Sequence, residues 1–367
     1  MTPNPLPALR GVLIASLSLV AAAAPARAQL QTMEVTRLAD GVYGAIYSEM
    51  VRDPVQSNSL IIIGDDGVCV VDTHYTPSAA RATIAEIRKL TPLPVRFVVT
   101  THWHDDHIFG NQEYAKAFPG VQFVAHQAVR TSMIANAFEH QQSLVTSYGA
   151  AVPRIEGRLA SGLDRDGKPL TAEGRADLVF LLPIYRAYLE DFKAVTIVLP
   201  TITFDKQVTL RLGSREVQVR WFGAGNTEGD AVIYLPKDRI AAVGDLVVYP
   251  VPFIYGGFPA SWVEVMRAVR ELGPETIVPG HGPVMRNFEY FDRVTALMQS
   301  MAAQAKAAVA RGLTLEETRK AFDLTAFHAQ FVQGKEGREG TFAASIVNSG
   351  IEAAYAEAKS AADKTKG

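Results

Sequence analysis

Residues 100–107, which read TTHWHDDH, decide the fold of this 367-residue chain. They follow a run of apolar, β-branched residues, so we expect a buried strand that gives way to a loop at the two threonines. In extended backbone His102, His104 and Asp106 alternate and project to the same side, whereas His107 points elsewhere. Two imidazoles can then bind one ion while the adjacent carboxylate and imidazole bind a second. Zinc takes such ligands, and two-metal sites hold ions about 3.5–4 Å apart. The stretch therefore predicts a metal site.

The same stretch resembles the His-x-His-x-Asp-His signature of the metallo-β-lactamase superfamily, and later pieces of the family pattern recur in order over roughly residues 33–285. The resemblance implies an α/β fold, namely a four-layer αββα sandwich with the metals at one edge. We expect this metallo-β-lactamase-like domain to occupy residues 29–287, with a mostly helical insertion at 127–197. A helical extension is expected at 288–367.

Two later motifs add candidate ligands through the resemblance. Asp245 follows a glycine at the end of a predicted strand, and the family has an aspartate here that bridges both metals. Taken alone, a Gly-Asp pair is a common turn. His281 lies in a Pro-Gly-His-Gly-Pro sequence, whose glycines let the backbone turn sharply, and in the family this histidine completes the second site. The second site then consists of Asp106, His107, Asp245 and His281.

One position departs from the family pattern. The glycine-rich loop 222–230 usually supplies a third histidine to the first metal, and Asn226 occupies that place here. A neutral amide oxygen is a much poorer zinc ligand than an imidazole nitrogen. The first site therefore has His102, His104 and Asp245, with Asn226 as a weak candidate ligand. Alternatively, Asn226 takes a turn conformation and faces away from the metals.

Three further residues follow or end predicted strands near the expected site. Asp72 either caps a turn or helix, or braces a metal ligand from outside the coordination sphere. An aspartate commonly ends this strand in the family, which favours the bracing role. We expect His74 to be a surface or turn histidine, and His126 to be a hydrogen-bonded structural histidine.

The first 28 residues predict an export signal. Arg10 supplies the positive start, residues 11–24 the apolar stretch, and Ala-Arg-Ala at 26–28 the cleavage pattern. The apolar part is short for a bilayer span, and no second span follows. An uncleaved anchor is the alternative. We expect cleavage, a periplasmic or secreted mature chain, and no membrane association afterwards.

The composition limits the classes of partner that we expect. The chain has 36 Lys and Arg against 38 Asp and Glu and no basic stripe, which argues against a nucleic-acid partner. Its single cysteine, Cys69, rules out an internal disulfide and lies in an apolar run, where we expect a small core residue. The expected partner is a small-molecule substrate, and a homo-oligomer is compatible with the sequence.

The insertion is the least familiar part of the chain. Residues 131–146 and 171–192 predict two helical segments, separated by a loop around residues 157–168. Pro183 should kink or divide the second segment. The insertion either packs on the sandwich or forms a lid over the active site. Residues 247–258, rich in Pro, Phe and Tyr, either pack on the core or form an apolar wall of the pocket.

These observations predict a hydrolase that uses one or two zinc ions to activate a water molecule for attack on a carbonyl-type substrate. Asp106 is the candidate catalytic residue, because it can orient or deprotonate that water. A cyclic amide, ester or lactone suits an exported, β-lactamase-like chain, and a glyoxalase-II-like thioesterase is the alternative of the same class. An iron-dependent redox enzyme, with iron or another divalent metal, and a catalytically silent binding protein remain open.

Overall fold

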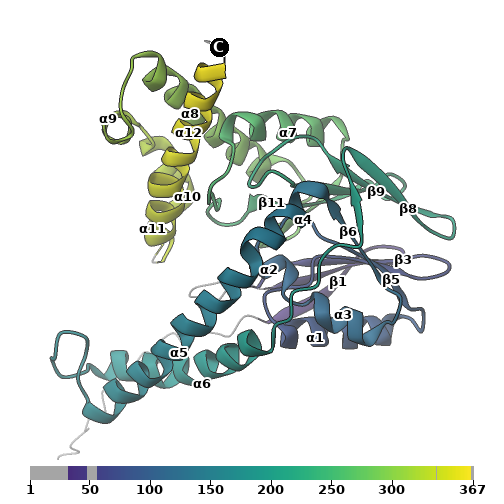
Figure 1. Ribbon diagram of the computed structural model, residues 1–367, viewed down its shortest axis with the longest axis horizontal. Helices are drawn as coiled ribbons and strands as arrows, with labels where there is room; N and C mark the ends of the chain where they lie inside the picture. The colour runs from purple at the N-terminus through teal and green to yellow at the C-terminus, as the bar shows by residue number, and fades with distance from the viewer. Residues whose placement is uncertain (1–31, 48–55, 336, 365–367) are drawn as a thin grey trace, which may run out of the picture.

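The computed structural model describes residues 32–47, 56–335 and 337–364, so the predicted export signal lies outside the described residues. Two sheets pack face to face, and helices cover the outer face of each, which confirms the predicted four-layer α/β sandwich (Figure 1). In the part of the chain that the structure describes, no helix has the length and apolarity needed to cross a membrane.

The first sheet places three functional segments at one edge. Strands β1 through β4 pair antiparallel, whereas β4 through β7 run parallel. The carboxyl ends of parallel strands meet at the same edge of a sheet, so Asp72, residues 100–107 and His126 lie at the ends of three adjacent strands. In spatial order the seven strands are β1 Met33–Ala39, β2 Val42–Tyr47, β3 Ser59–Ile63, β4 Val68–Val71, β5 Val95–Val99, β6 Gln122–His126 and β7 Ile202–Phe204.

The second sheet brings two more candidate ligands to that edge. Its strands are β8 Gln207–Leu212, β9 Arg215–Trp221, β10 Ala231–Leu235, β11 Ile240–Val248 and β12 Thr276–His281, in the order β12-β11-β10-β9-β8. β11 and β12 are parallel neighbours, and the other pairs are antiparallel. Asp245 in β11 and His281 at the end of β12 therefore lie on adjacent strands.

The central strands are apolar almost throughout, and successive side chains face opposite sides of the sheet, so one set forms the layer between the sheets. Leu60, Ile62 and Val71 from the first sheet meet Val217 and Val219 from the second in one buried cluster. Burial removes this apolar surface from water and stabilises the docked pair of sheets at roughly 25 cal/mol per Å².

The outer helices are set by local signals in the sequence. Helix α1 Pro77–Leu90 begins at Thr76, whose side chain accepts a hydrogen bond from the amide of Ala79, and Pro77 suits the first turn. It covers the first sheet together with α3 Asn111–Ala117. Helices α7 Pro259–Glu271 and α8 Glu289–Ala310 cover the second sheet.

The chain continues beyond α8 in a helical layer. Its elements are α9 Leu315–Ala321, α10 Thr325–Val332, α11 Arg338–Thr341, the π-helix η2 Phe342–Gly350 and α12 Ile351–Lys364. A capping box of Thr314 and Glu317 opens α9. Phe342 and Ile351 share one buried cluster with Trp262 of α7, so this layer packs on its own chain.

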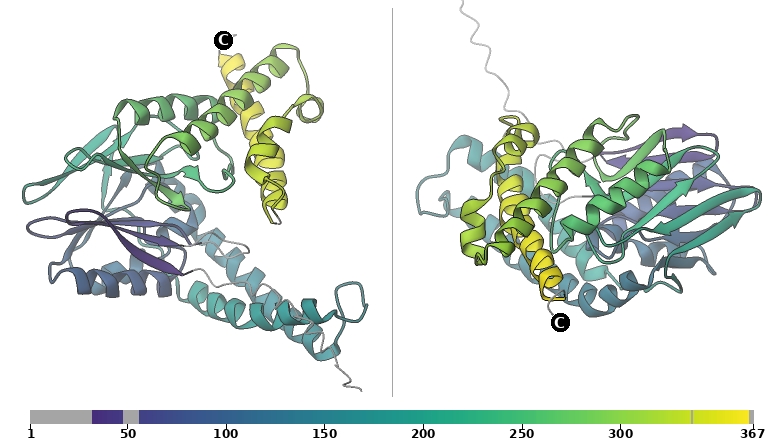
Figure 2. Two further views of the ribbon diagram at one scale, coloured as in Figure 1. Left: turned by 180° about the vertical axis from the view of Figure 1, so that it is seen from behind. Right: turned by 90° about the horizontal axis from the view of Figure 1, so that it is seen from above.

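The insertion forms a helical hairpin that leaves the sandwich (Figures 1 and 2). It consists of α4 Gln127–Ser132, the π-helix η1 Met133–Ala137, α5 Phe138–Ser161 and α6 Ala172–Ala194. Near its base, Gln141 and Phe192 are buried against the body of the protein. Beyond that base, α5 and α6 pair with each other and lead away from both sheets, so the insertion does not pack along the sandwich.

The structure corrects the bounds of the loop predicted in the insertion and excludes one of the two outcomes predicted for Pro183. The predicted loop around residues 157–168 begins too early, because α5 continues to Ser161 and ends only where Gly162 takes the left-handed conformation. Pro183 does not divide α6, which is continuous through it. A proline removes one helical hydrogen bond, and the packing of the long helix along α5 offsets that loss.

Candidate metal centre

The predicted ligand loop ends in a short helix. The chain leaves β5 at Val99, and α2 Asp105–Ile108 follows within six residues. The expected extended alternation therefore fails at Asp106, which lies with His107 in a helical turn. Acidic side chains are favoured in the first turn of a helix, and Asp105 and Asp106 supply them here.

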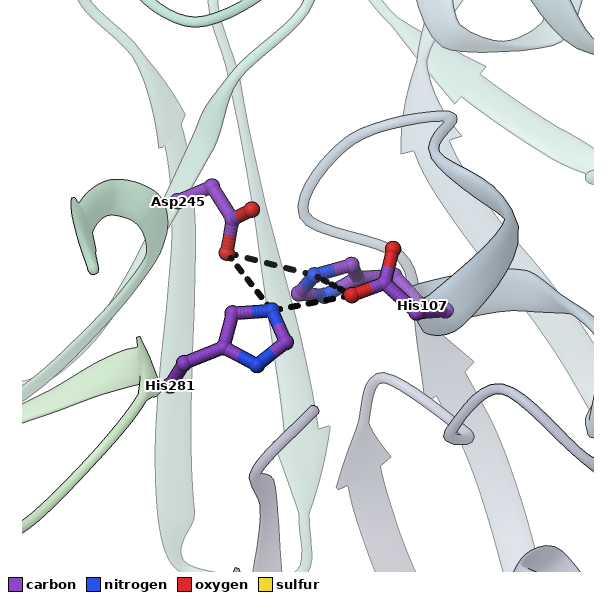
Figure 3. Close-up of side chains that lie close together, drawn as sticks. His107, Asp245 and His281 are labelled. Carbon is purple, nitrogen blue, oxygen red and sulfur yellow. Dashed lines mark ion pairs between the residues drawn. The ribbon is translucent and has the colours of Figure 1, made fainter. Parts of the chain in front are cut away.

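Four side chains from three segments converge at the edge of the sheets (Figure 3). His281 Nε2 lies 2.9 Å from Asp106 Oδ2 and 3.5 Å from Asp245 Oδ1. His107 Nε2 lies 3.2 Å from the same Asp245 oxygen. One donor atom from each of Asp106, His107, Asp245 and His281 lies within 4.8 Å of the others, a spacing that could hold one metal ion.

A second group shares Asp245 with the first. His102, His104 and Asp245 also bring one donor atom each within 4.8 Å of one another. His102 Nε2 lies 3.7 Å from Asp245 Oδ2. The other carboxylate oxygen, Asp245 Oδ1, faces His107. The two carboxylate oxygens thus point into different groups, as a carboxylate between two cations would.

The donor atoms fit a cation because several have no other partner. His104 Nε2, His107 Nε2 and Asp245 Oδ1 are buried and have no hydrogen-bond partner among the described residues. An unsatisfied buried polar atom costs about 1–3 kcal/mol, and more when it is charged. A divalent ion accepts electron pairs from these nitrogen and oxygen atoms and would satisfy them together.

Burial and the neighbouring charges set the protonation states of the group. Burial lowers the pKa of His104 to about 4 and the pKa of His102 well below its ordinary value, which leaves both rings neutral near pH 7. Burial opposes ionisation of Asp106, but the His107 charge outweighs it and lowers the pKa of that carboxyl. Burial opposes protonation of His107 and His281, but the facing carboxylates outweigh it and raise the pKa of both rings. Neutral imidazoles and ionised carboxylates are the forms that bind metal, so an ion would have to displace the proton that each of these two rings holds.

Two hydrogen bonds orient the rings from behind. His107 Nδ1 donates to Asp72 Oδ2 at 2.8 Å, and Asp72 Oδ1 accepts from the Thr101 amide. His281 Nδ1 donates to the backbone carbonyl of Gln56 at 3.1 Å. Each bond leaves the Nε2 atom facing the group, which is how ligands of this type are usually oriented. The contact of Asp72 matches the bracing geometry that the sequence favoured.

Asn226 lies in the loop between β9 and β10 and is fully buried. Neither its amide nitrogen nor its amide oxygen has a hydrogen-bond partner in the described part of the chain. The loop itself is fixed, since the Thr227 amide donates to Asp230 Oδ2 at 2.6 Å and the Phe258 amide donates to the Gly225 carbonyl at 2.7 Å. Its amide atoms are therefore buried and unpartnered within the described chain, as are His104 Nε2, His107 Nε2 and Asp245 Oδ1.

The segment 249–258 connects the two sides of the centre. It begins where the Tyr249 amide donates to the His281 carbonyl at 3.2 Å, and it returns to the loop of Asn226. Ser345 of η2 fixes it from outside by accepting from the Ile254 amide at 2.7 Å. Ile254 is buried whereas Phe253 is 42% exposed, so the segment packs on the core and also presents an aromatic surface.

His74 and His126, the two further histidines considered from the sequence, have structural roles. His126 donates through Nε2 to the Asp205 carbonyl and stacks on the Trp221 ring, which confirms a hydrogen-bonded structural histidine. Of the two alternatives predicted for His74, the turn is confirmed and the surface position is wrong. His74 is fully buried between the Ser57 carbonyl and the Thr83 hydroxyl, because the turn from β4 into α1 folds inward.

Two contacts of the centre carried no signal in the sequence. Gln56 acts on His281 through its backbone carbonyl, which every residue possesses. His140 of α5 lies 3.4 Å from Asp105 and packs edge-on against the Trp103 ring. A histidine spaced 35 residues from its partner cannot be paired with it without the fold.

Known proteins share this architecture. The chain matches the model of the Metallo-beta-lactamase superfamily over residues 52–281. It is 26% identical over 268 residues to a linear primary-alkylsulfatase of Pseudomonas sp., which covers 70% of this chain and 48% of the relative. The chain thus spans about half the length of that curated relative.

Solved structures show the same fold. A metallo-beta-lactamase from Pontibacter korlensis aligns with a TM-score of 0.52 and 19% identity, over 73% of this chain and 99% of that chain. A double mutant of the sec-alkyl sulfatase PisA1 aligns with a TM-score of 0.57 and 18% identity, over 79% of this chain and 45% of that chain. At these identities the likeness is one of fold.

Proposed function

Because this chain belongs to the metallo-β-lactamase superfamily, we propose that it is a hydrolase that uses one or two zinc ions and acts on a small carbonyl-type substrate. The observation that carries the proposal is the convergence of two donor groups on the shared Asp245 carboxylate. Iron or another divalent ion is the alternative metal, because imidazole and carboxylate ligands suit several first-row metals.

The residues would divide between two sites. Asp106, His107, Asp245 and His281 would hold one ion, and His102, His104 and Asp245 the other. Asn226 would complete the set of His102, His104 and Asp245 only as a weak, neutral ligand. When bound, such ions supply Lewis acidity, which lowers the pKa of a water molecule toward about 7 and polarises the substrate oxygen.

The chain's own groups would position the reaction. Asp106 presents a carboxylate 2.9 Å from His281 Nε2, and it would orient the attacking water or accept its proton. Asp72 holds His107 through Nδ1 and prevents the ring from turning. The buried side chains around the group exclude bulk water, which strengthens each electrostatic interaction inside it.

Two substrate classes follow from different observations. The active-site pattern and the expected export favour a cyclic amide, ester or lactone. The alkylsulfatase relative, which matches 70% of this chain, favours a sulfate ester as the second candidate. Both reactions need a water nucleophile and stabilisation of a developing negative charge.

The test combines metal analysis with a substrate panel. We expect protein purified without added metal to contain zinc and to hydrolyse at least one of a β-lactam, a lactone, an aryl ester, a thioester or an alkyl sulfate. His281→Ala should lose one ion and most of the activity. Full metal occupancy in that variant would contradict the ligand assignment, and iron with redox activity would favour the alternative enzyme class. Silence across the whole panel would favour a binding protein.

Export belongs to the same proposal and has its own measurement. The order of Arg10, the apolar stretch and Ala-Arg-Ala at 26–28 supports cleavage after Ala28. The intact mass of protein from its native host should then correspond to a chain that starts at Gln29. A full-length mass in the cytosolic fraction would contradict periplasmic export.

A further inference from the structure

The helical hairpin of α5 and α6 lacks a covering layer over most of its length. We call residues 142–187 the arm. Among its residues, all of which the structure describes, only Ile155 and Leu178 are buried. Helix α5 has 24 residues and is therefore about 36 Å long, and the arm extends into solvent beyond the sandwich in every view (Figures 1 and 2). Two helices that bury so little have little tertiary stabilisation of their own.

The apolar surface of α6 is too wide for α5 to cover. Residues 178–185 read LVFLLPIY, which is eight consecutive apolar or aromatic residues on a continuous helix. At 3.6 residues per turn these side chains point in every direction, whereas α5 contacts one face. Val179 accordingly remains 57% exposed, and Leu163 at the tip of the arm is 41% exposed. A helix that is apolar all round is normally buried.

The charges of the arm select the kind of partner. The arm carries both signs in nearly equal number, with no basic face that would suit a nucleic acid or an anionic membrane. Its charged residues are Arg154, Glu156, Arg158, Asp164, Arg165, Asp166, Lys168, Glu173, Arg175, Asp177 and Arg186. Arg186 and Glu156 already pair with each other within the arm. A surface of balanced charge does not repel a second copy of itself, as a strongly charged face of one sign would.

We propose that the arms of two copies of this chain pair along α6 and form an antiparallel four-helix bundle in solution. The pairing covers Val179 and the other apolar side chains of residues 178–185 that α5 leaves open. The dimer contact lies on the insertion, whereas the C-terminal helices already bury their apolar side chains against α7 of their own chain.

Sedimentation equilibrium of the full, metal-loaded chain tests the pairing. This method reports mass independently of shape, which matters for a molecule with a long arm. We expect twice the mass of one chain at micromolar concentration. Val179→Glu should raise the dimer dissociation constant at least about 100-fold, because a two-fold interface carries the buried charge twice. Val179→Ile should leave the dimer intact. Val347→Glu, at an exposed valine of η2, is the matched control on the C-terminal helices and should also remain dimeric.

The outcomes separate the arm from other surfaces. Circular dichroism and metal content should be unchanged in Val179→Glu, and if that variant fails to fold, Leu163→Glu at the tip tests the same arm. A natural chain of single mass would overturn the proposal, as would a dimer that survives the arm variants or is lost in Val347→Glu. A monomeric chain that sediments with phosphatidylglycerol vesicles would show that the arm binds lipid instead.

Discussion

At the residue scale, the space around Asp245 is made by a neighbouring glycine. A Cβ atom on Gly280 would lie 1.9 Å from Asp245 Oδ1 and 2.8 Å from the Gly244 carbonyl carbon. The second contact is with backbone, so the two parallel strands would have to move apart. The absence of a side chain at position 280 thus lets one carboxylate reach both donor groups.

The first prediction follows from this contact. Gly280→Ala should displace Asp245 and reduce the bound metal by at least one ion per chain. Most of the hydrolytic activity should be lost with it. Elemental analysis of the dialysed variant measures the loss. Gly157→Ala is the control, because a Cβ there meets nothing within 4 Å and the residue lies in a helix. Unchanged metal content in Gly280→Ala would show that Asp245 does not hold the ions.

Asn226 carries the second prediction. A neutral amide in the place of an imidazole should leave the first site weaker than the second, so zinc should bind in two calorimetric steps of unequal affinity. Asn226→His should tighten the weaker step at least about tenfold, and Asn226→Ala should not tighten it. Activity need not rise, because an imidazole is larger than the amide it replaces and must fit at a fully buried position. Two equally tight steps, unaffected by either change, would place Asn226 outside the first site.

The sequence predicted the residues of the centre better than their arrangement. The spacing of His102, His104 and His107 after a buried strand predicted a metal site without the fold, and the structure brings these side chains into two candidate donor groups. It did not reveal that Asp106 lies in a helical turn, because four residues are too few to produce a periodic pattern. Contacts made through a backbone carbonyl, such as that of Gln56, leave no trace in residue types.

At the scale of elements, the turn between β4 and α1 encloses a histidine that the centre does not use. His74 donates through Nδ1 to the Ser57 carbonyl and accepts from the Thr83 hydroxyl through Nε2. Burial, aided by the charge of His107, lowers the pKa of His74 to about 4 against the opposing hydrogen bond to Ser57. The ring is therefore neutral in the folded protein over the range in which the unfolded chain gains a proton.

The third prediction is the pH dependence of this turn. Above the ordinary histidine pKa of about 6.5, His74 does not oppose folding, and stability is lost as the pH falls from there toward 4. At pH 5 the loss from this group is about 2 kcal/mol. Asn keeps a donor and tolerates the positive φ of this position. The free energy of unfolding should be measured by urea unfolding at pH 7.5 and at pH 5, with a chelator present. The difference between the two values should be smaller for His74→Asn than for the natural chain. Equal differences would contradict the assignment.

The sequence predicted the strand before the ligand loop more accurately than the helices of the insertion. The apolar, β-branched run before Thr100 predicted a strand, and the structure shows β5 there at Val95–Val99. The arm was misjudged because Gly157 and Pro183 are ordinarily breakers, and both lie inside helices here. Propensity is a local signal, and pairing of α5 with α6 overrides it.

At the scale of the whole molecule, the C-terminal helices and the second sheet share one core. Phe342 of η2 is buried in the same cluster as Trp262 of α7 and Met301 of α8. The apolar core is therefore continuous between the predicted extension and the second sheet. The last elements of the chain therefore stabilise the strands that carry Asp245 and His281.

The fourth prediction tests this shared core. Phe342→Ala should lower the free energy of unfolding by about 3–5 kcal/mol, with loss of secondary structure and of bound metal in one transition. Phe253→Ala, at a partly exposed phenylalanine, should change stability far less. An early transition confined to the helical signal, with metal still bound, would instead show that the extension unfolds as an independent unit.

The convergence of both sheets on one edge also orders events in time. The donor residues begin at position 102 and end at position 281, so a growing chain has no complete centre until β12 has been made and docked. Contacts this distant in sequence form late in folding. The protein consequently meets its metal wherever folding is completed, and the ions available in that compartment decide which of them occupies the centre first.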